Sequence, residues 1–498
     1  MIVELTKAPG APLNPITASR AYIHRDSNLL LLLVCLAQFM VILDVSIVNV
    51  ALPAIRDGLG FSTAGLQWVI NAYTITFAGF LLLGGRASDL LGRRRVFIAG
   101  TALFTAASLV CALAGSPAVL LVSRAIQGFG GAVISAASLA IITTSFEEGA
   151  SRNRALGVWG ALGGLGATSG VLLGGVLTQG LGWPAIFLIN VPIGIAVVAF
   201  GGRIIPEGRS ELGHRHFDLT GALLVTTGMV ALVYGIVRTD VLGWGSPGVL
   251  VPLAAGVALL AGFGLVEGRL AAAPLMPLRV FRLRPLRSAN AVILLLYSAI
   301  FAMWFFVSLY MQQDLHHDAI ETGLAFLPMT LAVAGAATLA PKLIPKIGAR
   351  VVLTAGMISA TAGLALLTGV NPGGTYLAQV LPGGVLSAFG LGLALVPATI
   401  VAVRGVPAAE SGLASGLLNT SRLVGGAIGL AVLTTIATSH AHARIADGAS
   451  PVLAQTDGYQ LAFAVGAVLC FLGAVAAAVL LRPAREDEAA GELAEARG

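Results

Sequence analysis

The stretch Leu66–Arg95, LQWVINAYTITFAGFLLLGGRASDLLGRRR, joins an apolar run to a short basic loop. A transmembrane helix needs about 20 mainly apolar residues, so the run from Leu66 to Gly84 is long enough to cross a bilayer. The loop after it contains four arginines, while the run itself contains no charged residue. The same alternation recurs along the chain, and it predicts an all-α membrane protein.

The composition supports this prediction. Of 498 residues, 57% are hydrophobic and only 10% are charged, against about 25% in soluble domains. The mean hydropathy is +0.92, so lipid must solvate most of the surface, which excludes a soluble enzyme. The net charge of +6 comes from clusters between apolar runs. That placement indicates orientation in a membrane rather than nucleic-acid binding.

Fourteen segments are predicted to span the membrane. They are 28–52, 66–84, 96–115, 118–142, 155–179, 185–202, 217–237, 248–267, 288–311, 322–340, 351–370, 376–402, 412–438 and 459–481. An even number places both termini on one side. Of the 29 Lys and Arg residues, 24 then fall on that side and only Arg56, Arg238 and Arg444 on the other. Cytoplasmic loops are enriched in Lys and Arg, so both termini are predicted to be cytoplasmic.

An internal repeat groups these spans. At an offset of 256 residues, Gly92 corresponds to Gly348 and Arg94 to Arg350, and further pairs are Arg86–Lys342, Gly128–Gly384, Gly160–Gly416 and Gly170–Gly426. We therefore expect two related six-helix bundles, a design found in secondary transporters. The predicted parts are a cytoplasmic tail at 1–27, bundles at 28–203 and 288–481, two inserted helices at 217–267, a cytoplasmic linker at 268–287 and a disordered tail at 482–498.

Asp44 is the only one of 23 Asp and Glu residues deep within a predicted span. An ionisable group at that depth is costly and usually marks an ion or proton pathway. Asp44 lies about eight residues, and Arg124 about seven, from the outer ends of their helices, so their depths match. We predict that the two meet and that Asp44 binds and releases a proton. A permanent ion pair that only fastens two helices is the alternative.

Amide, aromatic and basic side chains within the spans predict a substrate cavity. They are Gln38, Asn49, Trp68, Asn71, Phe301, Trp304, Phe305, Asn419 and Arg422. For the aromatic residues, the alternative is contact with lipid or with the membrane interface. Asn419 and Arg422 are stronger candidates, because buried polar groups need partners. So sparse a polar lining suits amphipathic molecules, and Asp44 permits cations unless the proton occupies it.

Several other kinds of site are not expected. The sequence has no G-x-x-x-x-G-K-[ST] loop and therefore no reason to use ATP. The glycine-rich run 128–131 lies inside an apolar segment, unlike a dinucleotide site. His316 and His317 fit a solvated outer loop better than a metal site. The cysteines, Cys35, Cys111 and Cys470, lie in apolar runs, which predicts neither disulfides nor zinc. We expect no metal, no cofactor and no enzyme activity.

With these residues in view, the chain resembles the fourteen-span drug:proton antiporter family of the major facilitator superfamily. LDVSIVNVALP (Leu43–Pro53) resembles the helix 1 signature, with its acid at Asp44. LLVSRAIQGFGGA (Leu120–Ala132) resembles the helix 4 motif, which places the proton-linked arginine at Arg124 and its companions at Gln127 and Gly128. GLASGLLNTSRLVGGAIGLAV (Gly412–Val432) resembles helix 13 of the family.

Two further motifs carry the resemblance. The loop after helix 2 is similar to the cytoplasmic gate motif of the superfamily, with Gly85, Asp89, Gly92, Arg93 and Arg94 in its positions. We expect a two-glycine turn at its start, and Asp89 either to cap the next helix or to pair with arginines across the inner mouth. The antiporter seam of helix 5 corresponds to Gly166, Gly170, Gly174 and Gly175, although Val171 replaces its proline. The Trp-Arg-Trp common in relatives after this helix is Trp-Pro-Ala here, at 183–185.

The resemblance implies the major facilitator fold, with two six-helix bundles plus two extra helices. It also implies proton-coupled efflux of small amphipathic compounds such as drugs, antibiotics and toxic metabolites, by alternating access in a bacterial cell membrane. The expected partners are the lipid bilayer, protons and these substrates, without nucleic acid, and the expected state is a monomer. The alternatives are an importer or lipid and metabolite transporter of the same fold, and a membrane sensor or scaffold without transport. A titrating Asp44 favours transport over the last.

Overall fold

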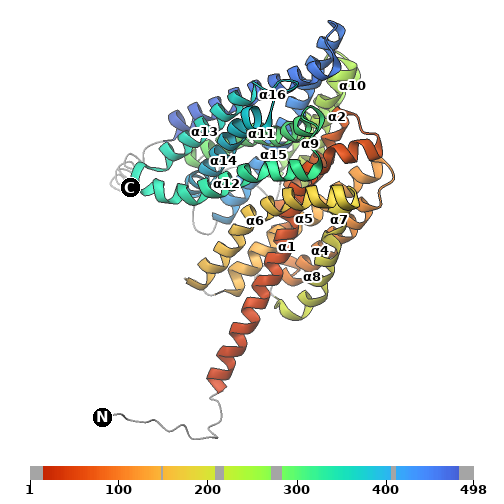
Figure 1. Cartoon of the computed structure of the whole chain (residues 1–498). Coiled ribbons are helices and arrows are strands. Elements are labelled where there is room, and N and C mark those ends of the chain that lie inside the picture. The colour runs from red at the N-terminus through yellow and green to blue at the C-terminus, as the bar shows by residue number, and fades with distance from the viewer. Residues whose placement is uncertain (1–14, 147–149, 208–217, 271–282, 405–410, 482–498) are drawn as a thin grey trace, which may run out of the picture.

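The computed structural model describes residues 15–146, 150–207, 218–270, 283–404 and 411–481, and every regular element among them is a helix. The predicted C-terminal tail lies outside these residues, as do 1–14 of the N-terminal tail and 271–282 of the linker. The first helix begins at Pro15, within the predicted tail. Figure 1 shows this part of the helix projecting beyond the bundle.

The N-terminal half contains eight helices, in which two short helices accompany the six predicted spans. They are α1 Pro15–Leu59, α2 Thr63–Leu66, α3 Trp68–Leu91, α4 Arg93–Ala112, α5 Pro117–Ser145, α6 Ala150–Leu181, α7 Ala185–Leu188 and α8 Asn190–Ile204. The short α7 and the longer α8 together form the predicted sixth span. The Ser116 hydroxyl caps α5 by accepting from the backbone N–H of Val119, and Pro117 fits the first turn.

Two helices and a second half follow. The inserted pair is α9 Leu219–Leu242 and α10 Pro247–Leu265, continued by a π-turn, η1 Val266–Leu270. The C-terminal half consists of α11 Arg284–Gln313, α12 Ala319–Ile347, α13 Ala349–Leu367, η3 Tyr376–Val380, α14 Leu381–Val403, α15 Ser411–Ala446 and α16 Pro451–Leu480. The capping box of Asp318 and Glu321 starts α12.

Among the described residues, twelve helices are long and apolar enough to cross a membrane. Each of them coincides with a predicted span. The predicted span at 66–84 corresponds to α3, whose apolar segment Trp68–Leu81 is shorter. The one at 155–179 corresponds to α6, a helix of 32 residues that contains nine glycines and is not among the twelve. The all-helical, multi-pass fold is thus present, with twelve clear spans rather than fourteen.

The expected two-glycine turn after α3 is wrong. The helix continues through Gly84 and Gly85 to Leu91, and the chain turns at Gly92 alone, with φ of 106°. Such a φ favours glycine. A Cβ on Gly84 would lie 3.1 Å from the Cα of Val133 in α5. This glycine therefore allows close packing of two helices, a common role for small residues in membranes.

Positions related by the offset of 256 residues make equivalent contacts in the two halves. Gly92 and Gly348, which is the connector between α12 and α13, both have positive φ, 106° and 82°. The Arg94 guanidinium donates to a backbone carbonyl of α8, at Gly202. In the same way, Arg350 donates to a carbonyl of α16, at Ala478. These contacts support a repeat of one six-helix pattern.

The two halves meet at the C-terminal end of α1, which is the predicted outer side. The Ser308 hydroxyl of α11 donates to the Asn49 carbonyl at 2.7 Å, and the Gln312 amide donates to the Val50 carbonyl at 3.0 Å. Between α6 and α12, the Gln179 amide donates to the Asp318 carboxylate at 3.0 Å. From this contact α6 and α12 diverge toward their other ends (Figure 1). The halves are therefore closed together on the predicted outer side.

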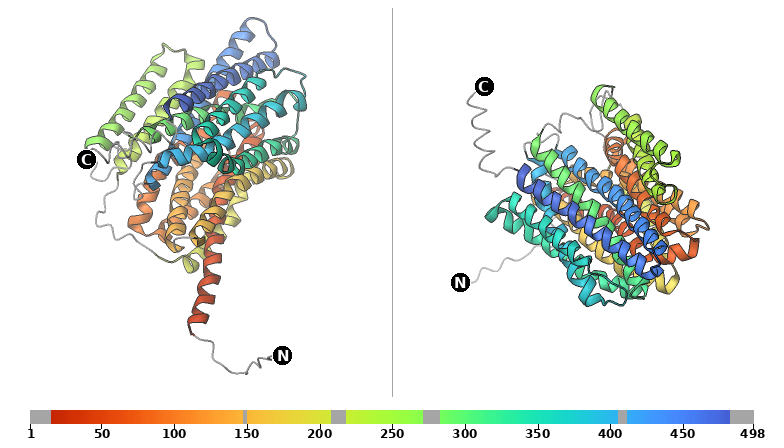
Figure 2. Two further views of the ribbon diagram at one scale, coloured as in Figure 1. Left: turned by 90° about the vertical axis from the view of Figure 1, so that its left-hand side faces the viewer. Right: turned by 90° about the horizontal axis from the view of Figure 1, so that it is seen from above.

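The inserted helices lie along one edge of the molecule (Figure 2). Of the two, α9 contacts both α3 of the first half and α15 of the second, where the Thr435 hydroxyl donates to the Ile236 carbonyl at 3.2 Å. The apolar side chains of α10 are largely exposed, as expected for a helix that faces lipid. Of the pair, α9 thus spans the junction of the halves on this edge.

Asp314, directly after α11, gives a prediction about stability and pH. Its Oδ1 accepts from the Thr456 hydroxyl at 3.2 Å, but its buried Oδ2 has no hydrogen-bond partner. Burial raises the pKa of Asp314 from 3.8 to about 6. The pKa of Asp314 is higher in the folded state than in the unfolded state. The contribution of this carboxyl to stability is therefore full at low pH and is lost as the pH rises through about 6. The advantage of Asp314→Asn over the wild type in thermal unfolding should therefore grow between about pH 4 and pH 7.

The matched control for this experiment is Asp318→Asn in the same loop. The backbone N–H of Glu321 and the amide of Gln179 lower the pKa of Asp318, so the stability from its charge is lost only as the pH falls. This variant should gain nothing at neutral pH. Thermal unfolding of the purified proteins, followed by tryptophan fluorescence from pH 4 to pH 8, measures both. Parallel curves for Asp314→Asn and the wild type would contradict the prediction.

Candidate functional site

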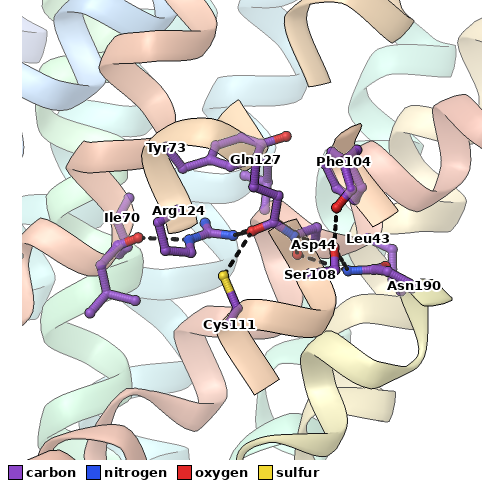
Figure 3. Close-up of polar contacts among 12 residues, drawn as sticks. Leu43, Asp44, Ile70, Tyr73, Phe104, Ser108, Cys111, Arg124, Gln127 and Asn190 are labelled. Carbon is purple, nitrogen blue, oxygen red and sulfur yellow. Dashed lines mark hydrogen bonds and ion pairs between the residues drawn. The ribbon is translucent and has the colours of Figure 1, made fainter. Parts of the chain in front are cut away.

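Asp44 lies in the middle of α1 with a side chain that is fully buried. Three donors from two other helices surround its carboxylate (Figure 3). The guanidinium of Arg124 donates to Oδ2 at 2.5 Å, and Oδ1 accepts from the Gln127 amide at 2.8 Å and the Asn190 amide at 3.0 Å. The predicted contact between Asp44 and Arg124 is therefore present. Its role in coupling stays a prediction.

Arg124, from α5, is 1% exposed and has partners besides Asp44. Its Nε donates to the Val69 carbonyl of α3 at 3.0 Å, and its Nη1 also donates to Gln127 Oε1 at 2.7 Å. The guanidinium carbon lies 4.4 Å from the ring centroid of Tyr73 and 5.7 Å from that of Phe187. Cation–π contacts of this kind stabilise a buried cation. Arg124 therefore keeps favourable contacts when Asp44 is neutral.

Gln127 connects the ion pair to α4. Its amide nitrogen donates to both Asp44 and the Ser108 hydroxyl, each at 2.8 Å, and its carbonyl accepts from Arg124. The Cys111 thiol also lies 3.7 Å from that carbonyl oxygen. Because every polar group of Gln127 is used, a change in the charge of Asp44 alters hydrogen bonds on four helices: α1, α4, α5 and α8.

Sequence reasoning did not find Asn190 and Ser108. Both are 0% exposed, and both lie within predicted spans. Asn190 donates to Asp44, while its own Oδ1 is buried without a partner. The available signal was an amide at the start of an apolar run, since a buried amide requires partners.

This network can neutralise a charge inside the membrane. A carboxylate and a guanidinium that pair at 2.5 Å offset part of the high cost of moving each ion out of water. A proton on Asp44 would remove its negative charge and leave Arg124 with the carbonyl, the amide and two aromatic rings. The site thus has two chemically reasonable states, which differ by one proton.

Arg124→Lys tests the geometry of the site. A lysine keeps the charge, but a compact ammonium cannot stack on Tyr73 and reach Val69, Gln127 and Asp44 together. We expect transport to fall about tenfold or more, a loss equivalent to one charge-assisted hydrogen bond. Arg56→Lys, at a partly exposed pair with Asp57, is the control. Equal transport by the wild type and Arg124→Lys would show that charge alone is required.

The residues of the predicted cytoplasmic gate motif lie at the end of the N-terminal half that is opposite the predicted outer side. Arg94 pairs with Glu207, which follows α8, at 3.2 Å, and Arg95 approaches the same carboxylate at 3.5 Å. Gly85 and Arg93 are partly buried, and Gly92 is the N-cap of α4. The side chain of Asp89 lies outside the described part, so its pairing is untested. The capping role expected of Asp89 therefore stays a prediction.

The glycines of the antiporter seam pack against two different helices. Cβ atoms on Gly166 and Gly174 would lie 2.7 Å from Ile42 Cγ2 and 2.8 Å from the Ile47 carbonyl, both in α1. Gly170 contacts α1 at Ser46, whose hydroxyl donates to the Gly166 carbonyl at 3.1 Å.

Gly175 faces α12 of the other half instead, where a Cβ would lie 2.9 Å from Ile320 Cα. From α12, a Cβ on Gly323 would lie 2.5 Å from the Val171 carbonyl. The seam therefore brings α1, α6 and α12 together. Within the N-terminal half, a Cβ added to Gly128 of α5 would contact the Tyr73 carbonyl of α3.

The predicted cavity residues fall into three groups. Phe305 is fully buried, and its ring centroid lies 5.3 Å from that of Phe306. This favours a position in the hydrophobic core over one in the lining of a cavity. Trp68 packs in a small cluster with α9 and α15, whereas Asn71 is fully buried with no hydrogen bond on either amide atom. Gln38 is buried, and the remaining residues are partly buried: Asn49, Phe301, Trp304, Asn419 and Arg422.

The family model described as Major Facilitator Superfamily matches residues 34–430. The chain belongs to the major facilitator superfamily. Among solved structures, the fold is similar to a transporter of the POT family, PepTSo, with a TM-score of 0.65, 16% identity and coverage of 90% of this chain and 98% of that one. The nucleoside transporter NupG gives a TM-score of 0.64 and 13% identity over 91% of this chain and 100% of that one. At such identities, only the fold is shared.

Curated members of the superfamily are closer in sequence. The cephamycin export protein CmcT of Amycolatopsis lactamdurans is 43% identical, over 82% of this chain and 85% of the relative. The puromycin resistance protein pur8 of Streptomyces alboniger is 38% identical over 91% and 90%, and the tetracenomycin C resistance and export protein of Streptomyces glaucescens is 36% identical over 82% and 76%. The predicted superfamily is confirmed. This multi-pass protein belongs with membrane transporters rather than enzymes.

Proposed function

We propose that this chain exports small amphipathic organic compounds, antibiotics among them, in exchange for protons. The observation that carries the proposal is the fully buried Asp44, paired with Arg124 and hydrogen-bonded to side chains of two other helices, α5 and α8. A carboxylate held in this way favours different structures with and without a proton. The relatives named as export or resistance proteins support the direction of transport.

The transport cycle alternates between two arrangements of the halves. The contacts at Asn49, Val50 and Gln179 join the halves on the predicted outer side. In the proposed cycle, we therefore assign this structure to the arrangement that takes up substrate from the cytoplasm. A proton from outside that binds Asp44 weakens its pairing with Arg124 and favours one arrangement. Release of the proton inside favours the other. Such a ligand shifts the equilibrium only through its different affinity for the two.

The full topology is part of the proposal. The twelve clear spans, together with α3 and α6, give fourteen, with bundles at 28–203 and 288–481 and both termini cytoplasmic. The basic residues on the predicted inner side support this orientation. The protein acts as a monomer in a bacterial cell membrane, without ATP.

Transport by intact cells tests the proposal. The chain is expressed in a bacterium that lacks its own efflux pumps, and extrusion of puromycin and of a fluorescent dye is measured with and without a protonophore. We expect extrusion that depends on the chain and stops when the protonophore collapses the proton gradient. Extrusion that continues unchanged would exclude proton coupling, and no extrusion of any compound would exclude export.

A further inference from the structure

Arg422 of α15 is a second cation within the spans, and it differs from Arg124. Its guanidinium carbon lies 4.8 Å from the ring centroid of Tyr297 in α11, while its Nε is buried without a hydrogen-bond partner. Among the described residues, no carboxylate forms an ion pair with it. A partly buried charge without a counter-ion is costly in a membrane. Such a group is expected to meet an anion at some stage of its function.

The position of Arg422 places it between the halves. One turn further along α15, Gly426 packs on the Phe301 ring, where a Cβ would lie 2.7 Å from Cδ1. Tyr297, Phe301, Trp304 and Ser308 follow helical spacing on one side of α11. Ser308 donates to the Asn49 carbonyl of α1, so this side of α11 faces the N-terminal half. The neighbouring Leu423 packs against the core cluster of that half.

An unpaired amide from α1 lies at the same level. The helices α1 and α11 both run from the predicted inner side to the predicted outer side, and they meet at Asn49 and Ser308. Eleven residues before this contact, or about 16 Å, lie Gln38 in α1 and Tyr297 in α11. Gln38 and Asn49 share one side of α1 by the same spacing. Gln38 is 7% exposed, and its Oε1 has no partner.

We infer that Arg422, Tyr297 and Gln38 form a subsite for the carboxylate of an amphipathic organic anion. The guanidinium provides a fork of donors that matches a carboxylate, and the amide nitrogen of Gln38, rather than its Oε1, is the further donor. Phe301 and Trp304, one and two turns away on α11, provide an aromatic surface for the apolar part of the molecule. The inference rests on the proposed export function and specifies its substrate class.

The site separates substrate recognition from proton binding. Asp44 and Arg124 satisfy each other within the N-terminal half, which leaves no net charge there when Asp44 is ionised. Arg422 is then the cation available to a ligand between the halves. A carboxylate is favoured over an amine here because a second positive charge would repel the guanidinium in a region of low dielectric constant.

Binding of a matched pair of probes tests the inference. The full chain, in nanodiscs of phosphatidylcholine, is titrated with 1-pyrenebutyrate and with its uncharged methyl ester, and binding is followed by quenching of tryptophan fluorescence. We expect the wild type to bind the carboxylate roughly tenfold more tightly than the ester. Arg422→Gln should lose this preference and keep its affinity for the ester. Arg422→Lys, which retains the charge without the fork, should fall between the two.

Several outcomes would overturn the inference. They are a wild type that binds neither probe or prefers neither, a preference unchanged in Arg422→Gln, and an equal loss of both probes in that variant. The last result would assign Arg422 a structural role. A preference lost only when the lipid is changed to phosphatidylglycerol would assign Arg422 to anionic lipid headgroups instead.

The assay needs no proton gradient, so it is independent of the proposed energy coupling. Asp44→Asn should retain the preference for the carboxylate while it loses proton-driven export. If cells show protonophore-sensitive export but the probes show no preference, only the subsite is wrong. If the preference is present but export ignores the protonophore, only the coupling is wrong.

Discussion

Asp44→Asn is expected to reach the membrane in normal amount and to lose proton-driven export entirely, to the level of cells without the transporter. Asparagine has the size of the protonated acid and keeps an oxygen that accepts from Gln127 or Asn190. It cannot ionise, so the pair with Arg124 never reforms and the protein cannot alternate between its two charge states. Because the neutral state belongs to the normal cycle, Arg124 should tolerate the change through Val69, Gln127 and its two rings.

Export of puromycin and of a fluorescent dye, set against the amount of protein in the membrane, measures the effect. Asp314→Asn is the matched control, because it removes a partly buried acid outside the spans that does not contact the Asp44 network. It should export like the wild type near neutral pH. Undiminished export by Asp44→Asn would favour the alternative, in which the ion pair only holds two helices together.

Gly175→Val is expected to have the second largest effect. The added side chain would collide with the Ala319 carbonyl and with Ile320 Cα, which a Cβ alone would approach to 2.9 Å. These are backbone atoms of α12, so they cannot rotate away. The valine should hold α6 and α12 apart, prevent closure on the predicted outer side and reduce export to near background.

Cross-linking measures that closure directly. The Gln179 amide and the Asp318 carboxylate lie 3.0 Å apart, so cysteines at these two positions should be joined by a short bifunctional thiol reagent when the halves are closed. The native Cys35, Cys111 and Cys470 are buried and should not interfere. Gly175→Val should reduce the cross-link strongly. Gly180→Val, also in α6 but with nothing within 4 Å of its Cβ, should leave cross-linking and export intact, and equal effects of the two variants would contradict the argument.

The features that follow from helix geometry were predictable from the sequence. The rise of a helix is constant, so counting residues from the helix ends placed Asp44 and Arg124 at one depth, and the two side chains do meet. The apolar runs located the helices for the same reason, because the thickness of the bilayer sets their length.

Features that depend on a neighbouring helix were not predictable. Glycine suits both a turn and a close helix contact, and only the position of Val133 shows that Gly84 has the second role. Trp304 and Phe305 are adjacent in sequence, but the rotation of about 100° per residue in a helix points them in different directions. Phe305 is consequently buried in the core, while Trp304 is partly exposed. The role of Asn190 was not predictable, because an uncharged amide hardly interrupts an apolar run.

Three contacts of α1 with other helices come from six consecutive residues. Asp44 holds the ion pair, Ser46 donates to the Gly166 carbonyl of α6, and the Asn49 carbonyl accepts from Ser308 of the opposite half. From the first to the last is about 8 Å along the helix axis. A protonation step at Asp44 therefore needs no relay of intermediate side chains to reach the boundary between the halves. The same rigid segment of α1 holds the ion pair and contacts the opposite half, so a small tilt of this helix moves both.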